Sequence, residues 1–224
     1  MPTSTWFRLN PVKRERILEA AQREFGTHGY STGSLNTIAR DADIAKGSLF
    51  QYFEDKLEFF AYVAEETARR IHAEMERRIA ASDFEQPFTH WLGDVCCMWA
   101  DYFAEHPLER GVTAAVNLEI DNAVRALVRG PSNHYYMRTI PSFSALWRER
   151  GDVRPDLDDD AATALLMLVL PHLALAPYYD GLDPVLGLRG KTPEEQYPVI
   201  RAFVANLAPL FEPGSNDRSE ARVG

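Results

Sequence analysis

The sequence predicts an all-α protein with a small N-terminal domain of three helices and a larger helical body. Apolar residues recur at helical spacing, as where Leu35, Ile38, Ala39 and Ala42 fall at i, i+3, i+4 and i+7. The composition changes after Asp83, where three of the four tryptophans and most of the prolines lie. Because 46% of the 224 residues are apolar, the chain can bury a substantial core.

We expect residues 1–56 to form the N-terminal domain, residues 57–212 to form the body, and residues 213–224 to be a disordered polar tail. No run of eighteen apolar residues is present, so we expect no span of a membrane and no membrane partner. The first ten residues lack an apolar signal core, which predicts a cytoplasmic location.

The first helix is expected over residues 11–28. Asn10 is a good N-cap, Pro11 suits the first helical position, and Gly29 is a good stop. Lys13, Arg14 and Arg16 give its first turn a positive charge, although the helix dipole favours acidic residues there.

Residues 34–53 predict two short helices joined by a tight turn. The hydroxyl of Ser34 can cap the first of these helices, and Asp43 can adopt the left-handed conformation that a turn requires. In the second helix, we expect Leu49, Phe50 and Phe53 to face inward. The residues left to face outward are Lys46, Gly47, Ser48, Gln51 and Tyr52. Such a pair is a helix-turn-helix unit, whose second helix can enter the major groove of DNA.

This stretch resembles the DNA-binding signature of the TetR family of transcriptional regulators. The matching positions are Ile38, Ala39, Ala42, Gly47, Leu49, Tyr52, Phe53 and Lys56, and the near-equivalents are Ile44, Ser48 and Phe50. Two positions depart from the family pattern: Asp43 replaces the usual turn glycine, and Ala45 replaces the usual serine, so the second helix is expected to lack a side-chain cap. The expected DNA contacts are Ser34, Thr37, Lys46, Gly47, Ser48, Gln51, Tyr52 and Lys56.

The distribution of charge is compatible with a DNA partner although the chain carries a net charge of −9. Residues 1–56 contain eight Lys or Arg and seven Asp or Glu, a net charge of +1, so the acidity lies in the rest of the chain. Affinity for phosphate depends on local positive charge.

The body is expected to contain long amphipathic helices. Gly130–Pro131 is expected to end one helix, and Pro141 to kink the next. Residues 161–175 are apolar on nearly all sides, which predicts that the segment is covered on most of its surface. The expected helices cover residues 56–81, 87–105, 109–128, 133–149, 161–175 and 193–211.

Aromatic residues and methionines are numerous in the body, and some of them could line a cavity for an apolar guest. His172, in the most apolar helix, is either a core histidine or a polar anchor in that cavity. The candidate pocket residues are Trp91, Met98, Trp99, Phe103, Asn117, Tyr135, Phe143, Trp147, Met167 and His172. The sequence alone does not separate cavity residues from core residues.

No catalytic signature is present: there is no Gly-x-Ser-x-Gly elbow, no glycine-rich phosphate loop and no His-Glu-x-x-His. His72 and Glu76 lie four residues apart on a helix, and we interpret them as a surface pair rather than metal ligands. We therefore expect no enzyme, no cofactor and no metal.

The family resemblance implies that the body binds a small molecule and that its last two long helices form a homodimer. The predicted function is a repressor that binds a palindromic DNA operator and is released by a small, largely apolar effector, such as a fatty acid, an acyl compound or a hydrophobic drug. The alternatives are a transcriptional activator, a ligand-independent DNA-binding protein, and, less favoured, an enzyme with a helical body. The operator, the regulated genes and the identity of the effector cannot be read from the sequence.

Overall fold

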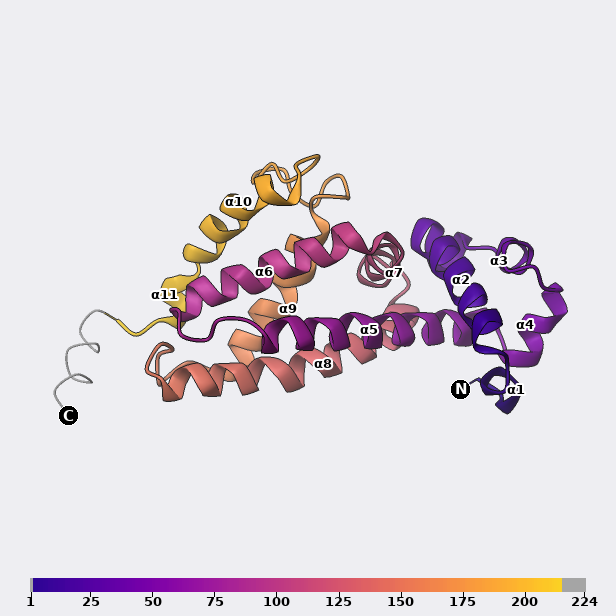
Figure 1. Ribbon diagram of the computed structural model, residues 1–224, viewed down its shortest axis with the longest axis horizontal. Helices are drawn as coiled ribbons and strands as arrows, with labels where there is room; N and C mark the ends of the chain where they lie inside the picture. The colour runs from indigo at the N-terminus through magenta and orange to yellow at the C-terminus, as the bar shows by residue number, and fades with distance from the viewer. Residues whose placement is uncertain (1, 215–224) are drawn as a thin grey trace. The chain divides into compact units, whose positions relative to one another are not determined.

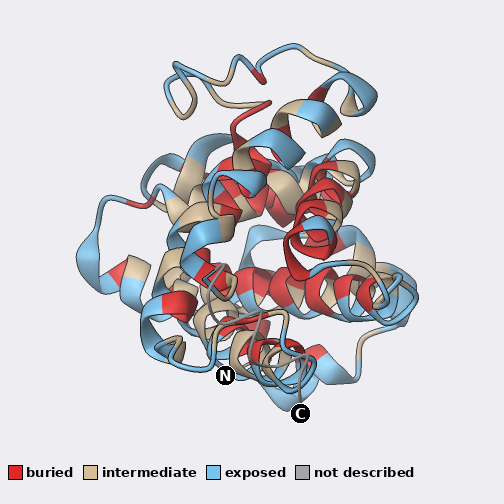
Figure 2. Ribbon diagram, turned by 90° about the vertical axis from the view of Figure 1, so that its left-hand side faces the viewer, coloured by how far each residue is buried: buried red, intermediate tan, exposed pale blue. Residues whose placement is uncertain are grey.

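A computed structural model describes residues 2–214, and the expected tail lies largely outside these residues. The described chain consists of helices and contains no strand, which confirms the all-α prediction (Figure 1). The buried residues form stripes along the helices, as helical periodicity requires (Figure 2). None of the helices within residues 2–214 is long and apolar enough to cross a membrane.

The chain divides into two compact units. The head unit contains the chain up to Ala73 together with His106–Ser132, and the body unit contains Glu74–Glu105 and the chain from Asn133 onward. These units are defined by packing, and His106–Ser132 returns to the head after the chain has passed through the body. The expected boundary between residues 56 and 57 was drawn from function and stays a prediction.

The head unit contains α1 (Ser4–Phe7), α2 (Pro11–Thr32), α3 (Leu35–Asp41), α4 (Lys46–Tyr52), most of α5 (Lys56–Ala80), α7 (Pro107–Asn117) and the start of α8 (Asn122–Glu149). Asn10 caps α2 by accepting the Val12 N–H at 2.8 Å, as expected. Gly29 interrupts α2 at a φ of 69°, and a short helical turn continues to Thr32. The expected stop at Gly29 is therefore a kink.

Helix α1 was not predicted, and it completes the core of the head. The Trp6 side chain is fully buried, and its ring centroid lies 5.7 Å from that of Tyr52 and 4.9 Å from that of Phe53. The backbone N–H of Thr3 donates to the Tyr52 carbonyl at 2.9 Å, and its hydroxyl donates to the Gln51 carbonyl at 2.8 Å. The N-terminal segment thus satisfies carbonyl groups at the end of α4 that the helix itself leaves without partners.

The body unit contains the end of α5, α6 (Phe88–Glu105), the rest of α8, α9 (Asp159–Leu175), α10 (Pro193–Ala205) and α11 (Ala208–Phe211). Helix α6 packs against both α9 and α10 (Figure 1). Asp158 caps α9 by accepting the Ala161 N–H at 2.9 Å, and Thr192 and Glu195 form a capping box at the start of α10. These caps fix where the two helices begin.

The expected break at Gly130–Pro131 is wrong, because α8 runs through Gly130, Pro131 and Pro141. The break lies earlier, between α7 and α8, where the Asp121 carboxylate accepts the N–H groups of Ala123 and Val124 and so starts a new helix. A proline inside a helix removes one backbone hydrogen bond. Packing of buried residues on α8, such as Val128 and Tyr136, offsets that loss.

Candidate DNA-binding surface and ligand cavity

The turn between α3 and α4 forms as the sequence predicts. Asp43 has a φ of 51°, the left-handed conformation that glycine adopts most easily. The Ile44 N–H donates to the Ala39 carbonyl at 2.9 Å across the turn, and the Asp43 carboxylate lies 3.7 Å from the Arg16 guanidinium. The turn therefore accepts a non-glycine residue at the cost of local backbone strain.

Helix α3 begins with the predicted cap. The Ser34 hydroxyl accepts the Thr37 N–H at 3.3 Å, and the Ser34 N–H donates to the buried Glu24 carboxylate at 2.7 Å. Thr37 is half-buried. Ser34 thus anchors α3 to α2, which gives it a positioning role beside any contact with DNA.

The exposed surface of α4 differs from the expectation at two residues. Lys46, Gly47 and Gln51 are exposed and Ser48 is half-buried. Tyr52, expected to face outward, is only 4% exposed, whereas Phe50, expected to face inward, is 50% exposed. The predicted orientations of both residues are wrong, because α1 places Trp6 against Tyr52 and so turns that ring into the core.

Lys56 lies at the start of α5 and is already engaged within the head. Its Nζ donates to the Ser31 carbonyl at 3.2 Å and lies 5.0 Å from the centroid of the Tyr30 ring. Burial lowers the pKa of the Lys56 ammonium, while the nearby Glu24 carboxylate opposes this effect. The Asp55 carboxylate accepts the Glu58 N–H at 2.8 Å, so this N–H is not available to a phosphate, and any contact there would come from the ammonium.

Helix α2 makes a close crossing with α7 inside the head unit. A Cβ atom added at Gly26 would lie 2.9 Å from the carbonyl carbon of Gly111, closer than packed atoms allow. Helix α7 also follows α6 after a single intervening residue, His106. Helix α7 packs directly against α2 and so supports it.

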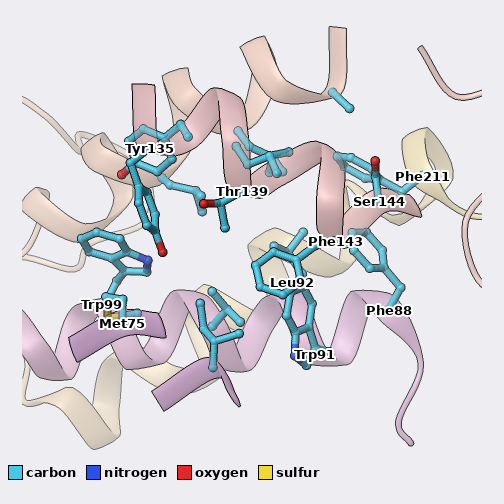
Figure 3. Close-up of a pocket in the computed structure, with 17 residues that line it drawn as sticks. Met75, Phe88, Trp91, Leu92, Trp99, Tyr135, Thr139, Phe143, Ser144 and Phe211 are labelled. Atoms are coloured by element: carbon cyan, nitrogen blue, oxygen red, sulfur yellow. The ribbon is translucent and has the colours of Figure 1, made fainter. Parts of the chain in front are cut away.

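The body unit contains a cavity of about 60 Å³. Its lining is aromatic and aliphatic, and residues from α5, α6, α8, α9 and α11 contribute to it (Figure 3). The lining residues are Met75, Ile79, Phe88, Trp91, Leu92, Val95, Trp99, Tyr135, Tyr136, Thr139, Ile140, Phe143, Ser144, Ala162, Leu166, Leu170 and Phe211.

Four of the predicted pocket residues line this cavity: Trp91, Trp99, Tyr135 and Phe143. Missed lining residues on α6, namely Phe88, Leu92 and Val95, share a helical spacing with the predicted Trp99. A helical stripe shared with the aromatic candidates was the signal that could have found them.

The other predicted pocket residues do not line the cavity. Phe103 and Trp147 are buried in the core, and Met98 and Met167 are half-buried. Asn117 belongs to the head unit, where its amide donates to the Thr113 carbonyl at 2.8 Å. His172 is exposed on α9, and its Nδ1 lies 3.0 Å from the Leu168 carbonyl oxygen. It is therefore neither a core histidine nor a polar anchor in the cavity.

The structure differs from the expectations for α9, in the body unit, and for His72, in the head unit. Leu168 on α9 is 68% exposed, and Ala161 and Ala164 on the same helix are exposed as well. His72 is 8% exposed and therefore buried rather than at the surface. Within the described residues no group of three or more His, Cys, Asp or Glu side chains could hold a metal ion.

A helix-turn-helix unit with an exposed α4 surface is typical of DNA-binding transcriptional regulators. Residues 17–63 match the model of the family described as bacterial regulatory proteins, tetR family. This region, which includes the helix-turn-helix, is therefore similar to the corresponding region of the TetR family.

Known relatives are similar over different lengths. A 60-residue segment is 33% identical to the HTH-type transcriptional repressor AcnR of Corynebacterium diphtheriae and covers 27% of this chain and 32% of that relative. The chain is also 26% identical over 197 residues to the HTH-type transcriptional regulator HbdR of Aromatoleum sp., covering 74% of this chain and 83% of the relative. The first match therefore spans about a third of the relative and the second most of it.

A solved structure shares the fold over most of the chain. The transcriptional regulator FadR from Bacillus subtilis, solved in complex with stearoyl-CoA, superimposes with a TM-score of 0.68 at 15% sequence identity. The match covers 85% of this chain and 96% of FadR. At this level of identity the likeness shows the fold alone.

Proposed function

We propose that the chain is a ligand-responsive repressor that binds a palindromic operator as a homodimer and is released by a small, largely apolar effector. The observation that carries this proposal is the pairing of an exposed α4 surface in the head with an apolar cavity in the body. The relatives include the transcriptional repressor AcnR, and FadR was solved in complex with stearoyl-CoA, which supports a repressor with an apolar effector.

DNA contact is assigned to the exposed face of α4. Lys46 supplies charge for phosphate groups, Gln51 can form two hydrogen bonds to an adenine edge, and Phe50 can contact the methyl group of thymine. Thr37 at α3 and the Lys56 ammonium are the proposed flanking contacts. Tyr52, whose ring is buried, supports α4 from behind.

The homodimer is assigned to the exposed apolar residues of α9 and α10. Leu168 on α9 is 68% exposed, and a shallow apolar groove on α10 is lined in part by Pro198, Val199, Ala202 and Phe203. Exposed apolar area of this kind is typical of protein interfaces. A two-fold dimer would place two α4 helices about 34–36 Å apart, on successive major grooves of a palindrome.

The test is an operator-release experiment. DNA that the full chain selects from a random pool is labelled, and binding is followed by fluorescence anisotropy with the Gln51→Ala, Lys46→Ala double variant as a control. We expect the selected sites to be palindromic and apolar small molecules to lower the anisotropy. Selection of no specific sequence would contradict operator binding, and specific binding that no apolar compound weakens would favour a ligand-independent DNA-binding protein.

The matching transcription assay separates repression from activation. With a reporter gene placed behind the selected site, we expect the chain to lower expression and the effector to restore it. Higher expression in the presence of the chain would identify an activator and overturn the repressor assignment.

A further inference from the structure

We propose that the cavity in the body unit binds a compact, uncharged molecule with one hydrogen-bonding group, such as an alcohol, a ketone or an ester, and excludes an ionised fatty acid. The proposal deepens the function above, because it assumes that this cavity holds the effector. It rests on three properties of the lining: its charge, its volume and the placement of its hydroxyl groups.

The lining contains no Lys, Arg, His, Asp or Glu side chain. A buried carboxylate without a partner is strongly disfavoured, because the interior does not replace its hydration. Arg138, whose guanidinium lies 5.9 Å from the centroid of the Tyr135 ring, is outside the lining and is 64% exposed. It is already paired with the Glu76 carboxylate at 3.2 Å, so an acidic head group would compete with that carboxylate.

The volume limits the size of the ligand. A water molecule requires about 10–15 Å³ of such volume, so a cavity of about 60 Å³ has room for about four to six water-sized groups. A short chain or a single small ring fills this space. A long acyl chain does not fit unless the packing of the body opens.

The hydroxyl groups at the cavity lie in two regions and already take part in hydrogen bonds: Ser144 with Asp159, and Tyr135 with Thr139. The Ser144 hydroxyl donates to the Asp159 carboxylate at 2.7 Å, and the Trp91 indole N–H donates to the Ser82 hydroxyl at 2.9 Å. Tyr135 and Thr139 lie four residues apart on α8, so they share a face of the helix. Figure 3 shows them in a region of the lining away from Ser144, Phe88 and Phe211.

Tyr135 and Thr139 are assigned to the polar atom of the ligand, because a hydroxyl can donate one hydrogen bond and accept two, so a pair that is hydrogen-bonded to each other can still bond a further group. Burial is the main reason that the pKa of the Tyr135 phenol is raised, so this group stays a neutral hydroxyl that can donate or accept. The half-exposed lining residues Thr139, Ile140 and Phe143 all belong to α8, which makes this side the route by which a ligand enters.

The experiment compares matched small molecules on the full chain without DNA. Trp91 and Trp99 line the cavity, so their fluorescence reports its occupancy. Methyl butanoate and pentanoate have the same number of non-hydrogen atoms and differ in charge, 1-pentanol tests a hydroxyl, and hexadecanoate tests a long ionised chain. We expect the Kd of pentanoate to be at least about tenfold higher than the Kd values of methyl butanoate and 1-pentanol.

Variants test the assigned groups. Thr139→Val and Tyr135→Phe are expected to weaken binding of 1-pentanol by about fivefold or more while leaving that of pentane unchanged, because removing a hydrogen-bond partner affects only the polar probe. Ser142→Ala is the matched control, because Ser142 is an exposed serine on α8 outside the lining, and it should leave both affinities unchanged. Leu166→Trp should fill the cavity and abolish binding of every probe.

Tighter binding of pentanoate or hexadecanoate than of the uncharged probes would overturn the proposal, and so would no binding of any probe. Equal loss in Ser142→Ala and Thr139→Val would overturn the assignment of the hydroxyl groups. If the uncharged probes bind but fail to release operator DNA, the ligand class of the cavity stands and the effector role in the proposed function fails.

Discussion

At the scale of single residues, the exposed side chains of α4 divide into groups that carry charge and groups that carry sequence information. A contact between Lys46 and a phosphate group carries no information about the base sequence. Gln51 and Phe50 instead present an amide and an apolar ring that can contact base edges. Because both are exposed, they are free to contact base edges without first disrupting the core of the head.

Substitutions on α4 should therefore affect DNA binding in two different ways. Gln51→Ala should cost about 1–3 kcal/mol at one base position and relax its preference. Lys46→Ala should weaken binding to all DNA sequences alike. It should also reduce the slope of log affinity against log salt concentration by about 1, which corresponds to one phosphate contact. Anisotropy titrations over a set of single-base operator variants at several salt concentrations measure both effects. A uniform loss for Gln51→Ala would contradict its role in reading bases.

The start of α4 can be stabilised by one change. Ala45 occupies the N-cap with a φ of −68° and a ψ of 138°, and it offers no side-chain hydrogen bond. Ala45→Ser supplies a hydroxyl acceptor for an N–H of the first turn and should raise the free energy of unfolding by about 1 kcal/mol. Urea denaturation followed by circular dichroism measures this. Ala45→Val, which cannot accept a hydrogen bond, is the control and should give no gain.

At the scale of elements, the head is held together by two contacts between helices that are far apart in the sequence. One is the close crossing of α2 and α7 at Gly26 and Gly111. The other is a double hydrogen bond from the Arg70 guanidinium on α5 to the Glu15 carboxylate on α2, with both distances 2.6 Å. Together they fix α2 against the helices that connect the head to the rest of the chain.

Gly26→Ala should destabilise the protein by about 1–3 kcal/mol, because the added Cβ forces α2 and α7 apart. Gly47 is the matched control, because it is also helical and no atom lies within 4 Å of an added Cβ. Gly47→Ala should instead stabilise by about 0.5–1 kcal/mol through helix propensity. Chemical denaturation of both variants tests the pair of signs, and an equal effect of the two substitutions would argue against the close crossing.

The ion pair between α2 and α5 should make stability depend on pH. The hydrogen bonds from Arg70 lower the pKa of the Glu15 carboxyl below its ordinary value of 4.5. Its stabilisation is therefore fully present above that value and is lost as the pH falls through the lower pKa of the folded state.

The difference in free energy of unfolding between the wild type and Glu15→Gln should thus be largest above about pH 5 and shrink in acid. Denaturant titrations across this range provide the measurement. Glu19→Gln, an exposed position on the same helix, is the control and should show a smaller dependence. If the difference in free energy of unfolding between the wild type and Glu15→Gln stays constant with pH, the ion pair does not contribute to stability as proposed.

At the scale of the whole molecule, the exposed apolar residues of α9 and α10 are the proposed surface for a second copy of the chain. Leu168 is 68% exposed, and Phe203 is half-buried beside the groove on α10. A palindromic operator requires two α4 helices at a fixed separation, so loss of the dimer should remove specific binding even when each head is intact.

Leu168→Glu should convert the dimer to a monomer, because burying an unpaired carboxylate in an interface is unfavourable. Ile120→Glu, at an 85% exposed apolar residue of the head unit, is the control and should leave the assembly unchanged. Light scattering at micromolar concentration measures both. A Leu168→Glu protein that remains a dimer would place the interface elsewhere.

Local patterns in the sequence were sufficient for the helix-turn-helix. Ser34, Asp43 and the uncapped Ala45 have the local conformations that their residue types favour, because caps and turns depend on neighbours within a few positions. The same holds for α5 and α6, whose apolar spacing predicted their lengths closely. These parts of the fold are specified by contacts that are near in sequence.

Contacts between distant segments decided the rest. Trp6 turns Tyr52 inward and leaves Phe50 exposed, although both rings fit the apolar spacing of a short helix. Packing of α8 overrides the helix-breaking preference of Pro131, and α9 leaves Leu168 exposed although its sequence is apolar on all sides. The sequence by itself determined the helical class, the recognition unit and the resemblance of that unit to a known family. Only the tertiary structure decided which aromatic residues line the cavity, because several helices must meet before a gap exists between them.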